Sequence, residues 1–535
     1  MIPMSTPVPS PDDPSLQSLN LRVVARIVTV VIILAYPLVF AGMYAGDAEI
    51  HLVYGESASN GHFFEFNPGE KSSGVTSIGY MMVVSALFKL FPSFYVPLVL
   101  KLINVAAWYA LVGLVYLIAR RLVASEWWAL AATAVSGLLP GSAYNSTIGM
   151  ENGLFAAVIF GAIFLIVRWR WLDPSSQFGM RRDIVIGTCL AISASLRPEG
   201  LLVVPLIIGY RCWIMRKSIL RPMVIASHGV AVTPFVLIAG AMVLFHISQT
   251  GDVLPSSGLS RMAISTREAV YLGPFWFSPK FTERLVYYLP VTIFWLVGNA
   301  VILRTHMMRG IYVHRLLVIL FWTFFLLYST VLGSAHLARY VIFLMPMFAL
   351  IATVGARWFW ESGPEIIKQN NALRWTGLTV GAIGISVIFA IETDIRRDLG
   401  AHDELVRAMR APEQRTEFSN AMMTKLGDPT ERPISLAYQE VQLRYWLDQR
   451  FVVRSLDGRV DKVMMDFVQD GTFDHIGYLK QRDVDFVVDL VNYNRDGNHW
   501  SLGALNSLDP GEVEIRDGIA FRKLDSGVIE VNYIP

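Results

Sequence analysis

The chain has 535 residues, of which 54% are hydrophobic and only 16% charged, and its formal net charge is +2. This apolar content exceeds what a soluble core needs and predicts a polytopic membrane protein. The basic residues form short clusters between apolar runs, so we expect no nucleic-acid partner. Cys189 and Cys212 both lie in or beside apolar segments, which argues against a disulfide framework or a thiolate metal site.

An apolar run over residues 23–43 follows a polar N-terminus. Residues 1–21 are rich in Pro, Ser and Asp and are predicted to be disordered in the cytoplasm, and the run after them is long enough to cross a bilayer once. A cleaved signal peptide is the alternative interpretation of that run. With the first run, later segments predict an all-α membrane domain over residues 22–392 with about eleven spans. They lie at 98–119, 126–140, 151–167, 184–196, 199–211, 223–247, 285–303, 315–332, 340–356 and 375–392.

Clusters of basic residues orient these spans. The loops in question hold Arg120 and Arg121; Arg168, Arg170, Arg181 and Arg182; Arg211, Arg216, Lys217 and Arg221; Arg304, Arg309 and Arg315; and Arg357, Lys368 and Arg374. The positive-inside rule places them in the cytoplasm. The apolar segment 76–91 would reverse this orientation if it crossed once, so it is predicted to be an interfacial or re-entrant helix on the outer face. The first outer loop then covers residues 44–97.

The composition becomes that of a soluble protein after residue 392. Residues 393–535 are long enough for an independent small domain, predicted to be α/β and to lie on the outer surface. Its strand-like runs are RPISLAY, RFVVRSL, DVDFVVDLV and VIEVNYI, and QEVQLRYWLD alternates with them like a short helix. Tyr438, Tyr445 and Trp446 could stack on sugar rings, or they could pack in the core of this domain.

The first outer loop opens with three ionisable residues, Asp47, Glu49 and His51. The residues after Asp47 have a helical pattern, for which Asp47 is a suitable N-cap. At the i,i+4 spacing Asp47 and His51 share a helix face, whereas Glu49 points roughly the opposite way. A partly desolvated carboxylate at the mouth of a membrane cavity could instead take a proton from a hydroxyl near neutral pH. The residues alone leave both interpretations open.

The outer loops hold a series of short motifs. They are GDAEIH at 46–51, NPGE at 67–70, SSGVTS at 72–77, IGMENGLF, SLRPEGLL, GDVLPSSGLSR, HLARYVIFLMP and, in the soluble part, ISLAYQEVQLRYWLDQRFVVRSLDGRV. In their order and outside placement they resemble those of the C-type glycosyltransferases (GT-C), membrane enzymes that use polyprenyl-phosphate sugars, and in particular mycobacterial arabinofuranosyltransferases. One position departs from that pattern, because this chain has Gly46 where the family has the first of two adjacent acids.

The resemblance implies an inverting transfer of a sugar from a polyprenyl-monophosphate donor to a hydroxyl of an extracytoplasmic glycan, lipid or protein. It implies Asp47 as the general base, with Glu49 in reserve and Glu151 as the substitute if the acid missing at position 46 matters. Cationic groups on the outer face would stabilise the departing lipid phosphate. The residues predicted to bind substrate are His51, Lys71, Glu151, Arg197, Glu199, Arg261, His336 and Arg339.

Several of these residues have a structural alternative. Arg197 and Glu199 lie between two short apolar runs, where they could form a purely structural ion pair. Arg339 could extend to lipid headgroups, and Lys71 and Arg261 could be solvated on polar loops. These alternatives are open at the level of the sequence.

We expect no obligatory metal or cofactor, because the sequence holds no motif typical of a metal site. A divalent cation could still bind at Asp47 and Glu49. The implied partners are the lipid-linked donor, the acceptor and membrane lipids, in the inner membrane of a bacterium. The nearest alternative function is a membrane polysaccharide polymerase or ligase that uses a diphosphate-linked glycan. A secondary transporter and a non-catalytic glycan receptor are further alternatives, the latter because of Gly46.

Overall fold

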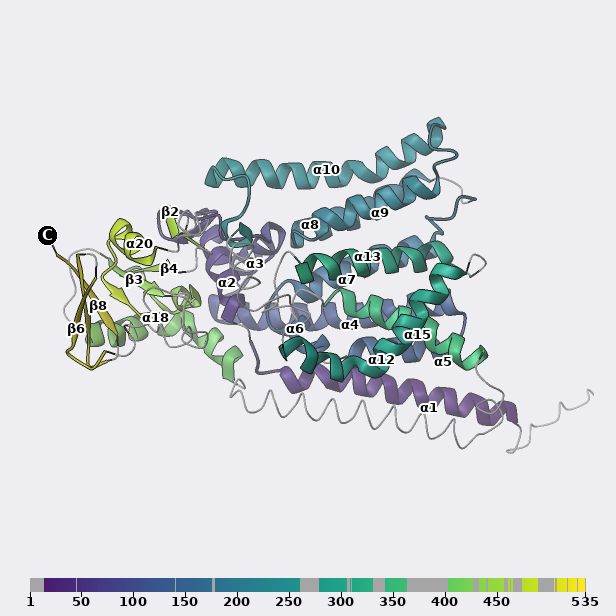
Figure 1. The fold of residues 1–535 in the computed structure, drawn as a ribbon, viewed down its shortest axis with the longest axis horizontal. Coiled ribbons are helices and arrows are strands. Elements are labelled where there is room, and N and C mark those ends of the chain that lie inside the picture. The colour runs from purple at the N-terminus through teal and green to yellow at the C-terminus, as the bar shows by residue number, and fades with distance from the viewer. Residues whose placement is uncertain are drawn as a thin grey trace, which may run out of the picture.

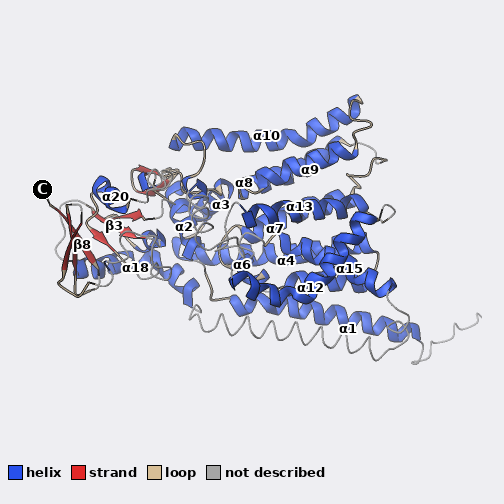
Figure 2. Cartoon of the chain, viewed as in Figure 1, coloured by secondary structure: helices blue, strands red, loops and turns tan. Residues whose placement is uncertain are grey.

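The computed structural model consists of a helical bundle and a C-terminal domain that contains most of the strands (Figures 1 and 2). The structure describes residues 14–44, 46–139, 141–175, 179–259, 279–305, 308, 310–330, 342–362, 403–426, 433–438, 441–456, 460–461, 463–464, 474–488, 505, 508–516, 518–526 and 528–534. The bundle contains α1 (Pro14–Ala35), η1 (Tyr36–Phe40), α4 (Val96–Val123), α5 (Glu126–Leu138), α6 (Ser142–Thr147), α7 (Asn152–Arg168), α8 (Met180–Leu196), α9 (Gly200–Ile214), α10 (Pro222–Thr250), α12 (Pro279–Arg304), α13 (Ile311–Thr330) and α15 (Leu344–Ser362).

The apolar helices identify a membrane protein. Within the described part of the chain, the helices over Ser93–Val123, Pro222–Thr250 and Ile311–Tyr328 are long and apolar enough to cross a bilayer by themselves. Every other predicted span overlaps a helix of the bundle, except 375–392, which lies outside the described residues. The number of spans stays a prediction.

Helix α1 begins at Pro14, inside the segment predicted to be disordered. Proline is well suited to the first turn of a helix, where its missing N–H has no intrahelical partner. The helix ends at Ala35, and Pro37 starts the tighter turn η1 within the predicted span. Lys101 on α4 is buried and donates from Nζ to the carbonyls of Phe40 (2.7 Å) and Met43 (2.9 Å), which lie at and just after the end of η1.

Arg211, predicted in a basic loop, is fully buried in α9. Its guanidinium lies 3.8 Å from the ring centroid of Trp171 and donates to Ser227 Oγ (2.8 Å). Asp183 accepts from Trp171 Nε1 (2.6 Å) and from Ser227 Oγ (2.5 Å). The helix continues to Ile214, so Arg211 is drawn into the bundle, where this network ties α8, α9 and α10 together.

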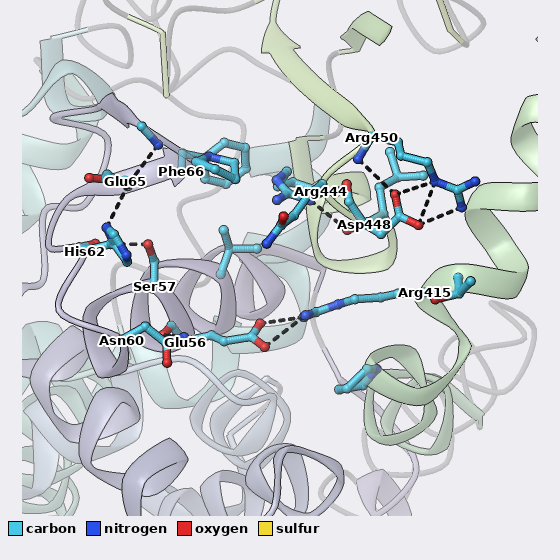
Figure 3. A pocket seen from close by; sticks show the side chains of 17 residues that line it. Glu56, Ser57, Asn60, His62, Glu65, Phe66, Arg415, Arg444, Asp448 and Arg450 are labelled. Carbon is cyan, nitrogen blue, oxygen red and sulfur yellow. Dashed lines mark hydrogen bonds and ion pairs between the residues drawn. The ribbon is translucent and has the colours of Figure 1, made fainter. Parts of the chain in front are cut away.

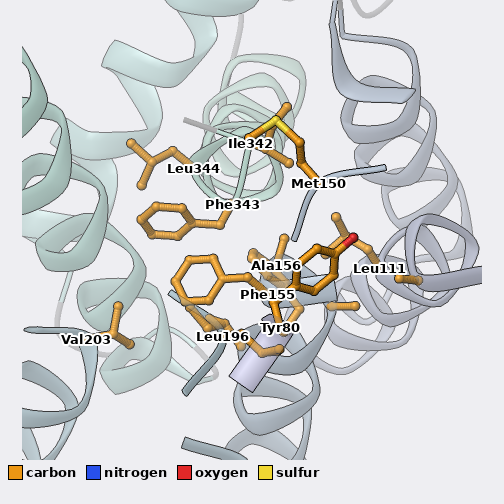
Figure 4. Close-up of a cluster of buried hydrophobic side chains, with 14 of the residues drawn as sticks. Tyr80, Leu111, Met150, Phe155, Ala156, Leu196, Val203, Ile342, Phe343 and Leu344 are labelled. Carbon is orange, nitrogen blue, oxygen red and sulfur yellow. The ribbon is translucent and has the colours of Figure 1, made fainter. Parts of the chain in front are cut away.

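The first outer loop contains α2 (Gly46–Ser59), β1 (Glu65–Asn67), β2 (Glu70–Lys71), α3 (Ile78–Leu90) and η2 (Ser93–Tyr95). Helix α3 covers the segment predicted to be interfacial, and it packs against α2, α4 and α8. Beneath these helices lies an apolar core in which the Phe343 ring meets the rings of Phe155 and Phe324 edge to face, with centroid distances of 5.3 and 5.0 Å (Figure 4).

The C-terminal domain contains a six-stranded sheet in its described residues, in the order β4-β3-β5-β8-β7-β6. Its elements are α18 (Glu404–Leu426), β3 (Ile434–Tyr438), η5 (Val441–Trp446), β4 (Phe451–Ser455), α20 (His475–Arg482), β5 (Phe486–Val487), β6 (Val513–Arg516), β7 (Ile519–Lys523) and β8 (Ile529–Tyr533). Strand β3 pairs in parallel with β4 and β5, and the remaining pairs are antiparallel. The predicted strand runs contain β3, β4, β5 and β8, and QEVQLRYWLD contains η5, so the α/β prediction is confirmed.

The NPGE motif joins the outer loop to an edge strand of this sheet. Asn67 uses its side-chain amide like a strand backbone, donating from Nδ2 to Val453 O (2.9 Å) and accepting from Val453 N at Oδ1 (3.0 Å). Both oxygens of Glu70 accept from Arg454, which is also on β4. Ser72 Oγ donates to Val460 O (2.7 Å). The motif therefore covers the edge of the sheet at β4.

Asn67→Ala should destabilise the attachment of the C-terminal domain. The change leaves the buried N–H and C=O of Val453 without partners, which costs about 1–3 kcal/mol in the free energy of unfolding. Denaturant unfolding of the full chain measures this loss. Asn420→Ala, at an exposed position of α18, is the control. Equal stability of the two variants would contradict the role given to Asn67.

Candidate functional site

A cavity of about 490 Å³ opens at the end of the bundle that faces the C-terminal domain. Its walls come from the start of α2, the loop before α3, the loop before α7, the turn between α8 and α9, and parts of α9, α10 and α13. The cavity thus brings together residues that are far apart in the sequence.

Helix α2 presents Asp47 and His51 to this cavity, as their spacing predicts. Asp47 is half-buried. Glu49 does not line the cavity: it is buried, and its Oε2 accepts from Trp446 Nε1 of η5 (3.0 Å). The two acids therefore lie on different faces of α2, and only Asp47 can reach a substrate in the cavity.

An ion network forms the floor of the cavity. Arg197 donates from Nη1 to Glu151 Oε1 (2.9 Å) and makes a bidentate pair with Glu199 through Nε (3.1 Å) and Nη2 (2.8 Å). On one side His51 Nε2 lies 3.1 Å from Glu151 Oε2, and on the other Tyr328 donates to Glu199 Oε1 (2.8 Å). The network connects α2, α7, α9 and α13.

The network sets the ionisation of its members. Burial by itself would raise the pKa of Glu151, but the charges of Arg197 and His51 outweigh it and hold that pKa at about 2. Burial would likewise lower the pKa of Arg197, and the attraction of Glu199 and Glu151 keeps it well above its usual range instead. Glu151 is therefore a poor proton acceptor, which leaves Asp47 as the better candidate for a base.

Two glycines allow the loops of this network to form. Gly149 has a φ of +86°, and a Cβ there would lie 2.4 Å from the Tyr44 ring. Gly200 begins α9 so close to α8 that a Cβ would lie 2.5 Å from the backbone of Ala194. These positions explain the glycines of the IGMENGLF and SLRPEGLL motifs.

The cavity also has an extensive apolar wall. It is formed by Ile50, Leu201, Leu202, Ala239, Met242, Val243, Val253, Leu254, Phe324 and Leu327. Such a wall suits a hydrocarbon chain that enters between helices α9, α10 and α13. An apolar groove between spans is expected from the resemblance, but its residues could not be named from the sequence because they come from several spans.

Two polar residues on the cavity wall were not predicted from the sequence. His246 on α10 is 3% exposed, and neither ring nitrogen has a hydrogen-bond partner among the described residues. Ser257 Oγ and His51 Nδ1 are also buried and have no hydrogen-bond partner among the described residues. Buried polar groups are rarely left unsatisfied, so these atoms are available to bind water or a ligand in the cavity. An isolated histidine in an apolar helix gave no sequence signal beyond its polarity.

Several predicted site residues lie away from the cavity or outside the described residues. Lys71 lies 3.2 Å from Glu65 and donates to Phe63 O (2.8 Å), away from the cavity lining. Arg261, His336 and Arg339 lie outside the described residues.

The three aromatic residues of the C-terminal domain have packing roles. Tyr445 is fully buried and donates to Ala408 O (3.3 Å), and Trp446 donates to Glu49. Tyr438 is partly buried against the core. Their arrangement follows the packing interpretation and offers no sugar-stacking surface from Tyr445.

Metal binding has no support from the geometry of the described residues. Within them no group of three or more His, Cys, Asp or Glu side chains could hold an ion. Asp47 and Glu49 lie on different faces of α2, which does not suit a shared divalent cation.

No protein-family model and no curated protein matches the sequence. Solved structures do match its fold. ArnT from Cupriavidus metallidurans bound to undecaprenyl phosphate is 12% identical, with a TM-score of 0.51 over 96% of this chain and 98% of that one. The oligosaccharyltransferase AglB from Archaeoglobus fulgidus, in complex with an inhibitory peptide and a dolichol-phosphate, is 12% identical, with a TM-score of 0.52 over 88% and 69%. The chain therefore has the GT-C fold of these two proteins.

A second cavity, of about 610 Å³, lies at the seam between α2 and the C-terminal domain (Figure 3). Its charged groups are paired across the seam and within it: Arg415 makes a bidentate pair with Glu56 (2.9 and 2.5 Å), and Arg450 pairs with Asp448 (2.7 Å). Arg444 Nη1 donates to Leu447 O (2.7 Å). The seam cavity is therefore polar, and its lining is already held in place by its own contacts.

Glu49→Gln should flatten the dependence of stability on pH. Burial, opposed in part by the hydrogen bond from Trp446, raises the pKa of Glu49 from its ordinary value of 4.5 to about 7. Between these two values the folded chain binds more protons at this group than the unfolded chain, so the free energy of unfolding falls as the pH rises through that window. The fall attributable to Glu49 is at most about 3 kcal/mol.

Glutamine is isosteric and can still accept from Trp446, so the variant keeps the contact without the titration. Denaturant unfolding of both proteins from pH 5 to pH 8 tests the point. We expect the wild type to lose more stability than the variant over this range. If the free energy of unfolding fell equally with pH in both proteins, the pKa of Glu49 would be the same in the folded and the unfolded chain.

Proposed function

We propose that this protein is an inverting membrane glycosyltransferase that moves a sugar from a polyprenyl-monophosphate donor to an acceptor hydroxyl. The observation that carries the proposal is the single cavity in which the carboxylate of Asp47 faces an apolar wall, beside a fixed ion network. A lipid-linked sugar needs these two surfaces together: a polar end for the reacting atoms and an apolar slot for the chain.

Asp47 is the general base of the proposed reaction. Its carboxylate takes the proton of the acceptor hydroxyl while the acceptor oxygen forms a bond to the anomeric carbon. The bond from that carbon to the phosphate oxygen breaks, and its electron pair leaves with the polyprenyl phosphate. Attack from the face opposite the phosphate inverts the anomeric configuration. Because Arg197 is already paired with Glu151 and Glu199, its charge is held by these two carboxylates.

The phosphate of the donor binds at His246, Ser257 and His51. Their unpartnered atoms are hydrogen-bond donors or can become so, and hydrogen bonds to a charged phosphate are among the stronger ones. The polyprenyl chain then follows the apolar wall towards α9 and α10. Both GT-C structures named above hold a polyprenyl or dolichol phosphate, which supports a lipid phosphate here.

The acceptor is a hydroxyl of a glycan, lipid or protein on the outer face of a bacterial inner membrane. The seam cavity is lined by residues of the same helix as Asp47 and is the place where we propose that the acceptor chain binds. Incubation of the purified protein with polyprenyl-monophosphate and polyprenyl-diphosphate sugars separates this function from that of a polymerase or ligase. Stabilisation and turnover with the diphosphate series alone would favour the latter.

Asp47→Asn should lower kcat at least about 100-fold, because it removes the proton acceptor without changing the volume of the side chain. Donor binding, measured as thermal stabilisation by the polyprenyl-phosphate sugar, should stay nearly unchanged. Glu49→Gln is the matched control, because that carboxylate lies outside the cavity. If Glu49→Gln abolished transfer and Asp47→Asn kept full activity, Glu49 and not Asp47 would be the general base.

His246→Ala should raise the KM for the donor about 10- to 100-fold, the loss expected when one hydrogen bond to a charged group is removed. The kcat at saturating donor should change less. His228→Ala is the control, because His228 is a buried histidine of the same helix that does not line the cavity and whose Nδ1 lies 2.7 Å from Val224 O. An equal effect on KM in both variants would show that His246 acts only through packing.

A further inference from the structure

A third cavity lies at the end of the bundle away from the C-terminal domain (Figure 1). It has a volume of about 430 Å³, and it forms where the last turns of α4 and α7, the turn after α7 and the start of α13 meet. Nothing in the proposed transfer reaction uses this end of the molecule.

Three arginines converge on this cavity: Arg121, Arg168 and Arg170. Asp173 is the one carboxylate in its described lining, and its Oδ1 already accepts from Ser175 N (3.0 Å) and Ser175 Oγ (2.7 Å). The described lining therefore has more positive than negative formal charge.

Two of these arginines are available to a ligand. Arg121 is engaged, because its guanidinium lies 4.8 Å from the ring centroid of Phe164 and Nη1 donates to Leu117 O (3.3 Å). Arg168 and Arg170 are exposed, and their side chains make no hydrogen bond or ion pair with the residues that the structure describes. Arg170 also has a φ of +49°, a conformation that costs free energy in a residue with a Cβ.

The rest of the cavity wall is apolar. Its apolar residues are Leu122, Ile166, Val167, Leu172, Met308, Ile311 and Val313. A free anion would gain nothing from this surface, whereas an amphiphile would bury carbon against it and keep its charge at the arginines. Because the guanidinium fork matches the oxygens of a phosphate, the chemistry of the cavity suits a phosphate group that carries fatty chains.

We propose that this cavity binds the phosphodiester headgroup of an anionic phospholipid, held by Arg168 and Arg170. Basic pockets between membrane helices are known to bind such headgroups, and each basic residue near an anionic surface contributes about 1 kcal/mol. The site is separate from the cavity of Asp47 and serves a structural lipid rather than the donor.

The test uses the full-length protein in a neutral detergent, titrated with phosphatidylglycerol and followed by native mass spectrometry. Arg168→Ala/Arg170→Ala should bind this lipid roughly 10- to 30-fold more weakly than the wild type. The control is Arg216→Ala/Lys217→Ala, which removes two exposed positive charges that do not line the cavity. It should bind the lipid like the wild type.

Three results would overturn the proposal. They are an equal loss of lipid in the control variant, unchanged binding in the Arg168/Arg170 variant, and equal retention of phosphatidylcholine by the wild type. A parallel titration with inorganic phosphate distinguishes the source of the phosphate. Thermal stabilisation of the wild type by phosphatidylglycerol without stabilisation by inorganic phosphate supports a lipid site, whereas equal stabilisation by both would contradict it. Because neither substituted arginine is buried, both variants are expected to fold.

Discussion

The ion network of Arg197 with Glu151 and Glu199 fixes the arrangement of the cavity. Burying one unpaired charge in this bundle would cost several kcal/mol, so each of these side chains depends on the others. Because Glu151 precedes α7 and Arg197 and Glu199 stand between α8 and α9, the pairs hold the outer ends of these helices in register. Tyr328 adds α13 and His51 adds α2. The position of Asp47 thus depends on ion pairs formed by other side chains.

Helix α2 connects the ion network to the C-terminal domain. One face of the helix presents Asp47 to the cavity, another accepts a hydrogen bond from Trp446 at Glu49, and its last turn pairs Glu56 with Arg415. The NPGE motif that follows adds the strand-like contact of Asn67 with β4. Since all these contacts are made by one short segment, a shift of the C-terminal domain would move the carboxylate of Asp47 as well.

The two ends of the bundle have opposite electrostatic character. The described lining of the cavity of Asp47 holds three carboxylates and one guanidinium, whereas that of the cavity at the other end holds three arginines and one carboxylate. This asymmetry agrees with the orientation expected from the basic loops.

The sequence by itself determined the class of the protein, the places of most helices and the face that Asp47 shares with His51. Apolar runs and i,i+4 spacing are local properties, so they survive without knowledge of the tertiary contacts. The tertiary structure alone decided that Glu49 faces Trp446, that Arg211 is buried beside Trp171, and that Asn67 docks to a strand far away in the chain. It also decided that His246 and Ser257 share a cavity with Asp47, because only the packing of separate helices places their side chains together.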